Sequence, residues 1–260
     1  MKYCVSARQP NSVLKKADEI KVAFQDINGI ENFIEDELNK TVIYEIPFNK
    51  REDEIEWLKL YSYAEKIDLK LALGNLKLVD KCKEYGLKYY WGFPISTYYE
   101  LEGVLQLGVC ELFLGVPLTF DLDNCKKYNL PIRVVANVAY DNYITRKNGI
   151  QGFYIRPEDI KLYDEYIDCI EFITSELSKE ATLLKIYKED GFWPGNLNLL
   201  LVNLNFNIDN RVLPDEFGEI RINCQQKCMR NNRCHFCESA FNFADNIRKE
   251  ALDRKKKNNN

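Results

Sequence analysis

The chain has 260 residues, of which 46% are hydrophobic and 29% charged, and its formal net charge is -4. This composition supports a full hydrophobic core and excludes global disorder and an overall basic surface for DNA. No apolar run reaches the roughly 18 residues of a membrane span, and the amino terminus lacks a secretion-signal pattern. The nine cysteines, an odd number, favour a reducing cytoplasm over a disulfide scaffold.

Short runs typical of β-strands recur along the chain from the amino terminus. Amphipathic stretches lie between many of them, at 52–67, 78–85 and 97–107, with apolar residues three and four positions apart. The residues at the ends of the predicted strands and helices include typical turn residues, namely Gly74, Gly86, Gly108, Gly115 and Asn129. The predicted strands are 2–7, 20–24, 41–46, 69–74, 88–93, 110–115, 132–138, 152–156 and 169–174.

Strand, short loop and helix in repeated order predict an α/β fold with a parallel sheet. We expect residues 1–175 to form a (β/α)-barrel-like domain, with an open doubly wound sheet as the alternative. No G-x-G-x-x-G follows the first predicted strand, so the usual dinucleotide fingerprint is missing. Residues 176–254 are expected to form a helical and loop-rich part of the same unit, which carries a cysteine-rich metal-binding segment. Residues 255–260 are expected to be a disordered tail.

Four cysteines lie within fourteen residues near the carboxyl end, in the spacing C-x3-C-x5-C-x2-C. They are Cys224, Cys228, Cys234 and Cys237. Four thiols so spaced can close around one metal ion or one cluster. The two short arms suit zinc and the tight serial spacing suits an iron–sulfur cluster, so both remain open. His235 is the only histidine in the chain, which excludes a histidine-rich catalytic metal site.

The segment around the first two cysteines, R-I-N-C-Q-Q-K-C-M-R, resembles the C-x-Q-x-C segment of the peptidase U32 family. The sequence at 108–121, GVCELFLGVPLTFD, is similar to a strand and turn of that family. The resemblance extends loosely over residues 69–237. It implies a (β/α) barrel, a [4Fe-4S] cluster held in part by Cys224 and Cys228, and oxygen-independent hydroxylation of an RNA base or a small molecule.

The cysteine order departs from the pattern of that family. Its members place their other ligand cysteines before the C-x-Q-x-C segment, whereas Cys234 and Cys237 follow it here. Cys169 is the nearest upstream alternative. Only Cys224 and Cys228 are therefore implied as ligands by the resemblance, and Cys234 and Cys237 are predicted from spacing alone.

Polar residues at the carboxyl ends of the predicted strands would face the mouth of a barrel, where the active sites of such folds lie. Glu45 and Glu171 interrupt apolar runs and can act as buried general acids or bases. An internal ion pair with an arginine such as Arg133 is the alternative. Arg156 ends another apolar run and can hold a phosphate or carboxylate. Further candidates are Asn75, Asn137 and Glu158.

Aromatic residues are concentrated at 89–99, where they are Tyr89, Tyr90, Trp91, Phe93, Tyr98 and Tyr99. These residues suit a protein core, and they also suit a surface on which a flat substrate stacks. The long segment 140–151 is a candidate binding loop or lid.

Two functions are compatible with these features. The first is an iron–sulfur enzyme that modifies a small-molecule or RNA-type substrate at the barrel mouth, where Glu45, Arg156 and Glu171 act. The second is a non-enzymatic binding or assembly protein, such as a phage encodes, in which the four cysteines hold a structural zinc ion. The sequence indicates neither the substrate nor the oligomeric state.

Overall fold

The computed structural model describes residues 1–7, 12–22, 27–35, 40–115, 118–138, 154–173, 177–202 and 208–224, and scattered positions between 239 and 254. Eight strands in these ranges form one parallel sheet in the order β5-β4-β3-β2-β1-β8-β7-β6. The strands are β1 (Lys2–Ala7), β2 (Glu19–Val22), β3 (Thr41–Ile46), β4 (Asp68–Leu73), β5 (Lys88–Trp91), β6 (Leu112–Leu114), β7 (Ile132–Val135) and β8 (Cys169–Phe172). The helices are α1 (Gly29–Glu35), α2 (Trp57–Ala64), α3 (Val79–Glu84), α4 (Tyr98–Gln106), α5 (Leu122–Lys126), α6 (Leu177–Leu184) and α7 (Phe217–Ile222).

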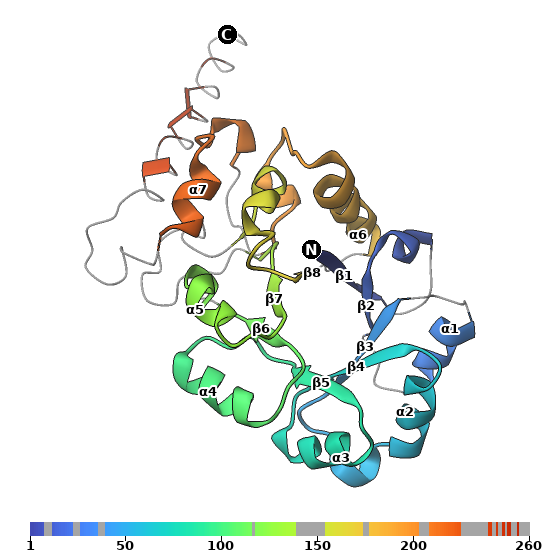
Figure 1. Ribbon diagram of the computed structural model, residues 1–260. Coiled ribbons are helices and arrows are strands. Elements are labelled where there is room, and N and C mark those ends of the chain that lie inside the picture. The colour runs from blue at the N-terminus through green and yellow to red at the C-terminus, as the bar shows by residue number, and fades with distance from the viewer. Residues whose placement is uncertain are drawn as a thin grey trace.

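Strands β5 and β6, at the two ends of this order, meet and nearly close the sheet into a barrel. The backbone N–H of Cys110 donates to the carbonyl of Tyr89 at 2.9 Å, and the N–H of Ile95 donates to the carbonyl of Phe113 at 2.8 Å. Figure 1 shows the strands as a ring with α1 to α6 around its outside. The prediction of a (β/α) barrel is therefore confirmed.

The strands are buried on both faces because they lie between the barrel interior and the surrounding helices. In β3, every residue except Glu45 is buried. Helix α2 buries Trp57, Leu60 and Tyr63, which share one face of the helix. Gly108 and Asn129 adopt left-handed backbone conformations with φ of 78° and 54°, so both are turn residues as predicted.

The prediction of a strand at 152–156 is wrong for its described part. Tyr154 to Arg156 form no strand and lead into a 3₁₀ helix, η6 (Pro157–Tyr163). The reason is that β7 and β8 pair directly with each other, with Arg133 opposite Cys169. No sheet edge is left between them for another strand.

The chain after β8 completes the ring of helices and then returns across the barrel. The residues that follow α6 form an ion pair with the amino-terminal part of the ring, in which Lys188 Nζ lies 2.7 Å from Asp18 Oδ1. Further on, the N–H of Val202 donates to the carbonyl of Asn137 at 2.7 Å, and Val202 forms a parallel bridge with Val138. Residues up to Val202 therefore cover the carboxyl end of β7.

Several predicted features lie outside the described residues. They are the tail at 255–260, the segment 140–151, and three of the four clustered cysteines, Cys228, Cys234 and Cys237.

Candidate functional site

Charged side chains occupy the barrel interior, where branched apolar residues usually pack. They come from four strands, β2, β4, β7 and β8, and from the residue that precedes β6. Apart from Lys70, which is partly exposed, they are buried. The residues are Glu19, Lys21, Lys70, Glu111, Arg133 and Glu171.

Arg133 lies at the centre of this network and is completely buried. Its Nε lies 2.7 Å from Glu111 Oε1, its NH1 lies 3.4 Å from Glu171 Oε2, and its NH2 contacts Glu19. The guanidinium also lies 5.2 Å from the ring centroid of Tyr90, a favourable cation–π position. The ion pair between Glu171 and Arg133, which the sequence left as an alternative, is thus present.

Lys70 joins two of the same carboxylates at the amino-terminal end of the network. Its Nζ lies 2.7 Å from Glu111 Oε2 and 3.1 Å from Glu19 Oε1. The carboxylates of Glu19 and Glu111 are therefore each shared between Lys70 and Arg133. Lys2, whose side chain is 55% exposed, adds a third cation 3.1 Å from Glu19 Oε1, so both carboxylates are fully compensated, as buried charges require.

The network continues toward the barrel mouth through Lys21. Lys21 lies two residues after Glu19, on the same face of β2 and nearer its carboxyl end. Its Nζ lies 3.1 Å from Glu171 Oε1 and 3.4 Å from Glu45 Oε2. The side chain of Glu45 is 46% exposed, against 9% for Lys21. Glu45 is therefore the point at which the buried network meets solvent at the mouth.

The network keeps Glu19, Glu171 and Lys21 ionised. Burial alone would raise the pKa of Glu19, but Arg133 and Lys70 together lower it from 4.5 to about 2. Burial would also raise the pKa of Glu171, but Lys21 and Arg133 outweigh this effect and lower the pKa of Glu171. The pKa of Lys21 is raised because Glu171 and Glu45 outweigh the effect of its burial. At neutral pH Lys21 is a cation and not a free amine.

One group inside the barrel has the composition of a metal site. A carboxylate oxygen of Glu19, one of Glu111 and the sulfur of Cys169 all lie within 4.8 Å of one another. However, Arg133 and Lys70 already contact both carboxylates. A metal ion there would meet two fixed positive charges, so we assign no metal to this group.

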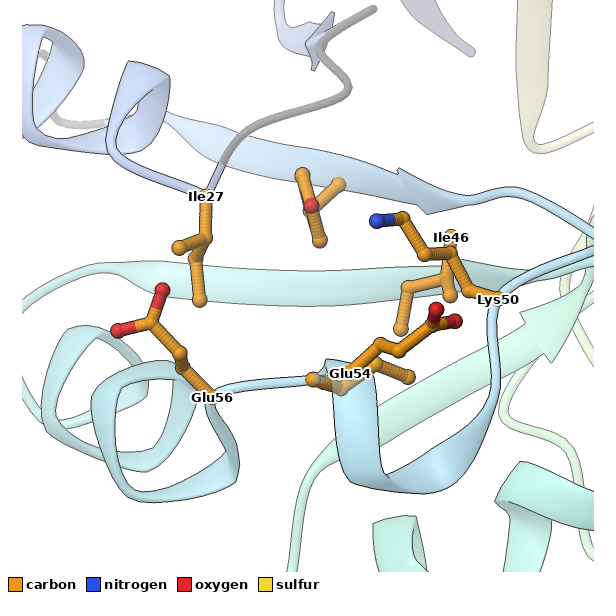
Figure 2. Close-up of a pocket in the computed structure, with 7 residues that line it drawn as sticks. Ile27, Ile46, Lys50, Glu54 and Glu56 are labelled. Carbon is orange, nitrogen blue, oxygen red and sulfur yellow. The ribbon is translucent and has the colours of Figure 1, made fainter.

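A small hollow lies on the outer side of β3, and Figure 2 shows the residues that line it. The charged ends of Lys50, Glu54 and Glu56 surround a floor that includes Ile27 and Ile46. Its volume is about 180 Å³. This is below the roughly 300 Å³ at which small-molecule sites begin. The hollow is therefore too small for a typical small-molecule site.

The structure places Arg156 away from the network, in a buried ion pair. Its Nε and NH2 donate to the carboxylate of Asp159 at 2.6 and 2.8 Å. It also lies 3.4 Å from the carbonyls of Pro214 and Asp215, just before α7. Arg156 thus ties η6 to the chain that leads into α7. An anion could reach its guanidinium only by displacing Asp159, and the anion-binding role stays a prediction.

The other polar candidates hold backbone in place. Asn75 caps a short helix by accepting the N–H of Lys77 at 3.1 Å. Asn137 is buried, and its side chain accepts the N–H of Ile173 at 2.9 Å and donates to the Ile173 carbonyl at 2.7 Å. Glu158 accepts a hydrogen bond from Asn210. Asn137 lies at the mouth, whereas Glu158 belongs to the Arg156 region.

The cysteine segment is described only at its first residue, Cys224. Cys224 is partly exposed and follows α7, and its N–H donates to the carbonyl of Arg221 at 3.1 Å. Helix α7, which precedes Cys224, lies against η6, where Gly218 is close to Asp159. This helix lies outside the barrel ring (Figure 1).

The two predicted carboxylates thus meet through a residue that the sequence did not single out. Glu45 and Glu171 both contact Lys21, and Glu171 also contacts Arg133. The signal in the sequence was a charge two residues after another charge in an apolar run, Glu19 and Lys21. Such alternation marks one face of a strand, and here that face is the barrel interior.

No protein-family model matches the chain, and no curated protein matches it in sequence. Solved structures with similar folds include 3-keto-L-gulonate-6-phosphate decarboxylase from Vibrio cholerae, at 11% identity and a TM-score of 0.46. That match covers 74% of this chain and 99% of the other. An enolase protein from Sargasso Sea environmental sequencing matches at 10% identity and a TM-score of 0.46, over 70% of this chain and 56% of the other. Likeness at this level gives no basis for transferring an activity.

In the part of the chain that the structure describes, no helix has the length and apolar character needed to cross a membrane.

Proposed function

We propose that this protein is an enzyme that acts on a small molecule, or on a base of an RNA, at the carboxyl-terminal mouth of the barrel. The observation that supports this most is the exposure of Glu45 at the end of a buried charge network. Burying charges carries a large desolvation cost, and apolar residues of similar volume are often at least as stable. Networks that retain buried charges beside an open mouth are typical of functional sites.

The geometry suits a reaction in which a proton moves and negative charge develops on the substrate. Lys21 is a fixed cation that can stabilise an oxyanion, because Glu171 holds it at 3.1 Å. Glu45 is accessible and can accept or donate a proton. Arg133 holds Glu171, Glu171 in turn positions Lys21 from behind, and neither Arg133 nor Glu171 reaches solvent. Proton transfer next to a carbonyl or carboxylate is the class of reaction that fits.

Two substitutions at the mouth test which side chain binds the substrate. In equilibrium dialysis of the full-length protein against a small-molecule extract, we expect one or more compounds to be retained by the wild type and lost with Lys21→Met. We expect Glu45→Gln to retain the same compounds within about threefold, because its amide keeps the shape of the carboxylate. Lys88→Met is the matched control, because Lys88 pairs with Asp68 at the opposite end of the barrel. Retention by Lys21→Met equal to wild type would contradict the assignment.

We further propose that Cys224, Cys228, Cys234 and Cys237 bind one [4Fe-4S] cluster, with a zinc ion as the alternative. Their spacing and the resemblance to the peptidase U32 family support this, and the four thiolates suit either group. A cluster supplies one-electron transfer. A zinc ion bound by four thiolates has no open position and stabilises the carboxyl-terminal part instead.

Anaerobic purification followed by an absorbance spectrum and iron, sulfide and zinc analysis tests the cofactor. We expect either a broad band near about 400 nm with iron and sulfide, or about one zinc per chain. The metal should be lost in Cys224→Ser Cys228→Ser and kept in Cys110→Ser, a partly exposed cysteine outside the segment. Metal content unchanged by the double substitution would contradict the proposal.

A further inference from the structure

A groove of about 570 Å³ lies outside the barrel wall, between helix α4 and the residues that follow β4 and β5. Its volume falls within the range of small-molecule sites. Its apolar lining includes Leu76, Trp91, Phe93 and Tyr99. The side chains of strands alternate, so Tyr90 is buried inside the barrel while Trp91 faces this groove. We propose that the groove binds a flat aromatic ring that carries a positive charge, independently of the reaction proposed at the mouth.

The aromatic residues of the groove are arranged for stacking and are not filling a core. The rings of Trp91 and Phe93 meet edge to face with centroids 5.3 Å apart. Phe93 is 45% exposed and Tyr99 is 87% exposed. Exposed aromatic side chains that converge on one groove offer faces on which a planar ligand can stack.

A glycine in the middle of α4 keeps one wall of the groove open. Gly103 is the sixth of nine residues in this helix and lines the groove. A glycine at such a position costs about 1 kcal/mol relative to alanine. A Cβ atom built on Gly103 would meet no atom within 4 Å, so packing within the protein does not require a glycine there. Close approach of a ligand to the backbone is a role that explains it.

The charge of the groove favours a cation over an anion. Glu100 and Glu102 line it, and its lining residues, all of them described, include no lysine, arginine or histidine. Glu100 is fixed by the backbone N–H groups of Ser96 and Thr97, at 2.8 and 3.1 Å. Glu102 is exposed and also lines the groove. A ring with a cationic edge can stack on the aromatic residues while its charge faces these carboxylates, whereas a phosphate would be repelled.

Three rings of equal shape test the proposal: benzamidinium, neutral benzamide and anionic benzoate. Ligand-observed NMR titrations of the full chain should give affinities in that order. In Gly103→Leu, whose side chain fills the groove, the affinity for benzamidinium should fall at least about tenfold, the size expected for loss of ring stacking. The thermal midpoint of this variant should be no lower than that of wild type, because leucine is the better helix former.

A second substitution tests the charge. Glu102→Gln should weaken benzamidinium about three- to fivefold and leave benzamide unchanged. Glu165→Gln, an exposed acid away from the groove, is the matched control and should change neither affinity. Equal binding of all three rings, no binding at millimolar concentration, or an affinity unchanged in Gly103→Leu would each overturn the proposal. So would a dimer in sedimentation that Gly103→Leu dissociates, because the groove would then be an interface between two copies.

Discussion

Replacement of Arg133 by methionine is expected to lower the free energy of unfolding by about 3–5 kcal/mol, the range for a buried ion pair that loses one partner. Arg133 is completely buried and contacts Glu19, Glu111 and Glu171. Methionine has a similar length but removes a cation that contacts all three buried carboxylates, and it leaves them with Lys21, Lys70 and the largely exposed Lys2. Urea denaturation at neutral pH, followed by circular dichroism, measures the change.

The same variant should respond differently to acid. In the wild type, the pKa of Glu19 is lowered from 4.5 to about 2, so Glu19 stabilises the fold above pH 4.5 and this contribution is lost as the pH falls toward 2. Without Arg133, burial raises the pKa of Glu19 again, and the carboxyl group takes up its proton at higher pH. The difference in stability between wild type and Arg133→Met should therefore narrow below pH 4.5.

Arg211→Met is the control for the loss of an arginine. Arg211 pairs with Asp209, but its side chain is 64% exposed. Its replacement should change the stability by about 1 kcal/mol at most, as for other surface ion pairs. A loss in Arg133→Met no larger than this would contradict the account of the barrel interior.

Substitution of Gly218 by alanine is expected to lower the stability by about 2–4 kcal/mol, since breaking a buried ion pair costs about 3–5 kcal/mol and helix propensity returns about 1 kcal/mol. A Cβ atom on Gly218 would lie 2.3 Å from Cγ of Asp159 and 2.8 Å from its Cβ. Asp159 would have to move, and its two hydrogen bonds with Arg156 would break. Helix α7 would then lose its packing against η6.

Hydrogen exchange followed by mass spectrometry can localise this effect. Faster exchange is expected in residues 208–224, with little change in β1 to β5, and the thiol of Cys224 should react faster with an alkylating reagent. Gly103→Ala is the matched control, because it places a Cβ in another helix where no atom lies within 4 Å. It should stabilise the protein by about 0.4–1 kcal/mol. Equal effects of the two substitutions would contradict the role assigned to Gly218.

The alternation of β-rich and amphipathic segments was enough to predict the barrel. Strands such as β3 were predicted with their observed bounds, Thr41–Ile46. The prediction of an extra strand at 152–156 was wrong because the residue pattern does not show that β7 and β8 pair directly. Tyr154 and Ile155 are residues typical of a strand, yet here they lead into the 3₁₀ helix η6.

The charged interior was harder to predict, for a physical reason. In a barrel the strands are buried on both faces, so period-two patterns do not separate the inside from the outside. Glu171 could be matched with Arg133, but Lys21 joins Glu171 to Glu45 only because β2 lies between β1 and β3 and β8 pairs with β1. The ion pair of Arg156 was not predicted, because its partner, Asp159, lies three residues away and could equally belong to ordinary helix-end chemistry.

A turnover measurement tests whether the barrel mouth beside Glu45 is a site of reaction. The anaerobically purified wild type and Glu45→Gln are each incubated with a small-molecule extract, and the mixtures are compared over time by mass spectrometry. We expect the wild type to consume at least one compound and to form its product. Glu45→Gln should do so at least about 100-fold more slowly, as expected for the loss of a general acid or base. Equal consumption by the two proteins, or no consumption by a wild type with its metal intact, would contradict this expectation.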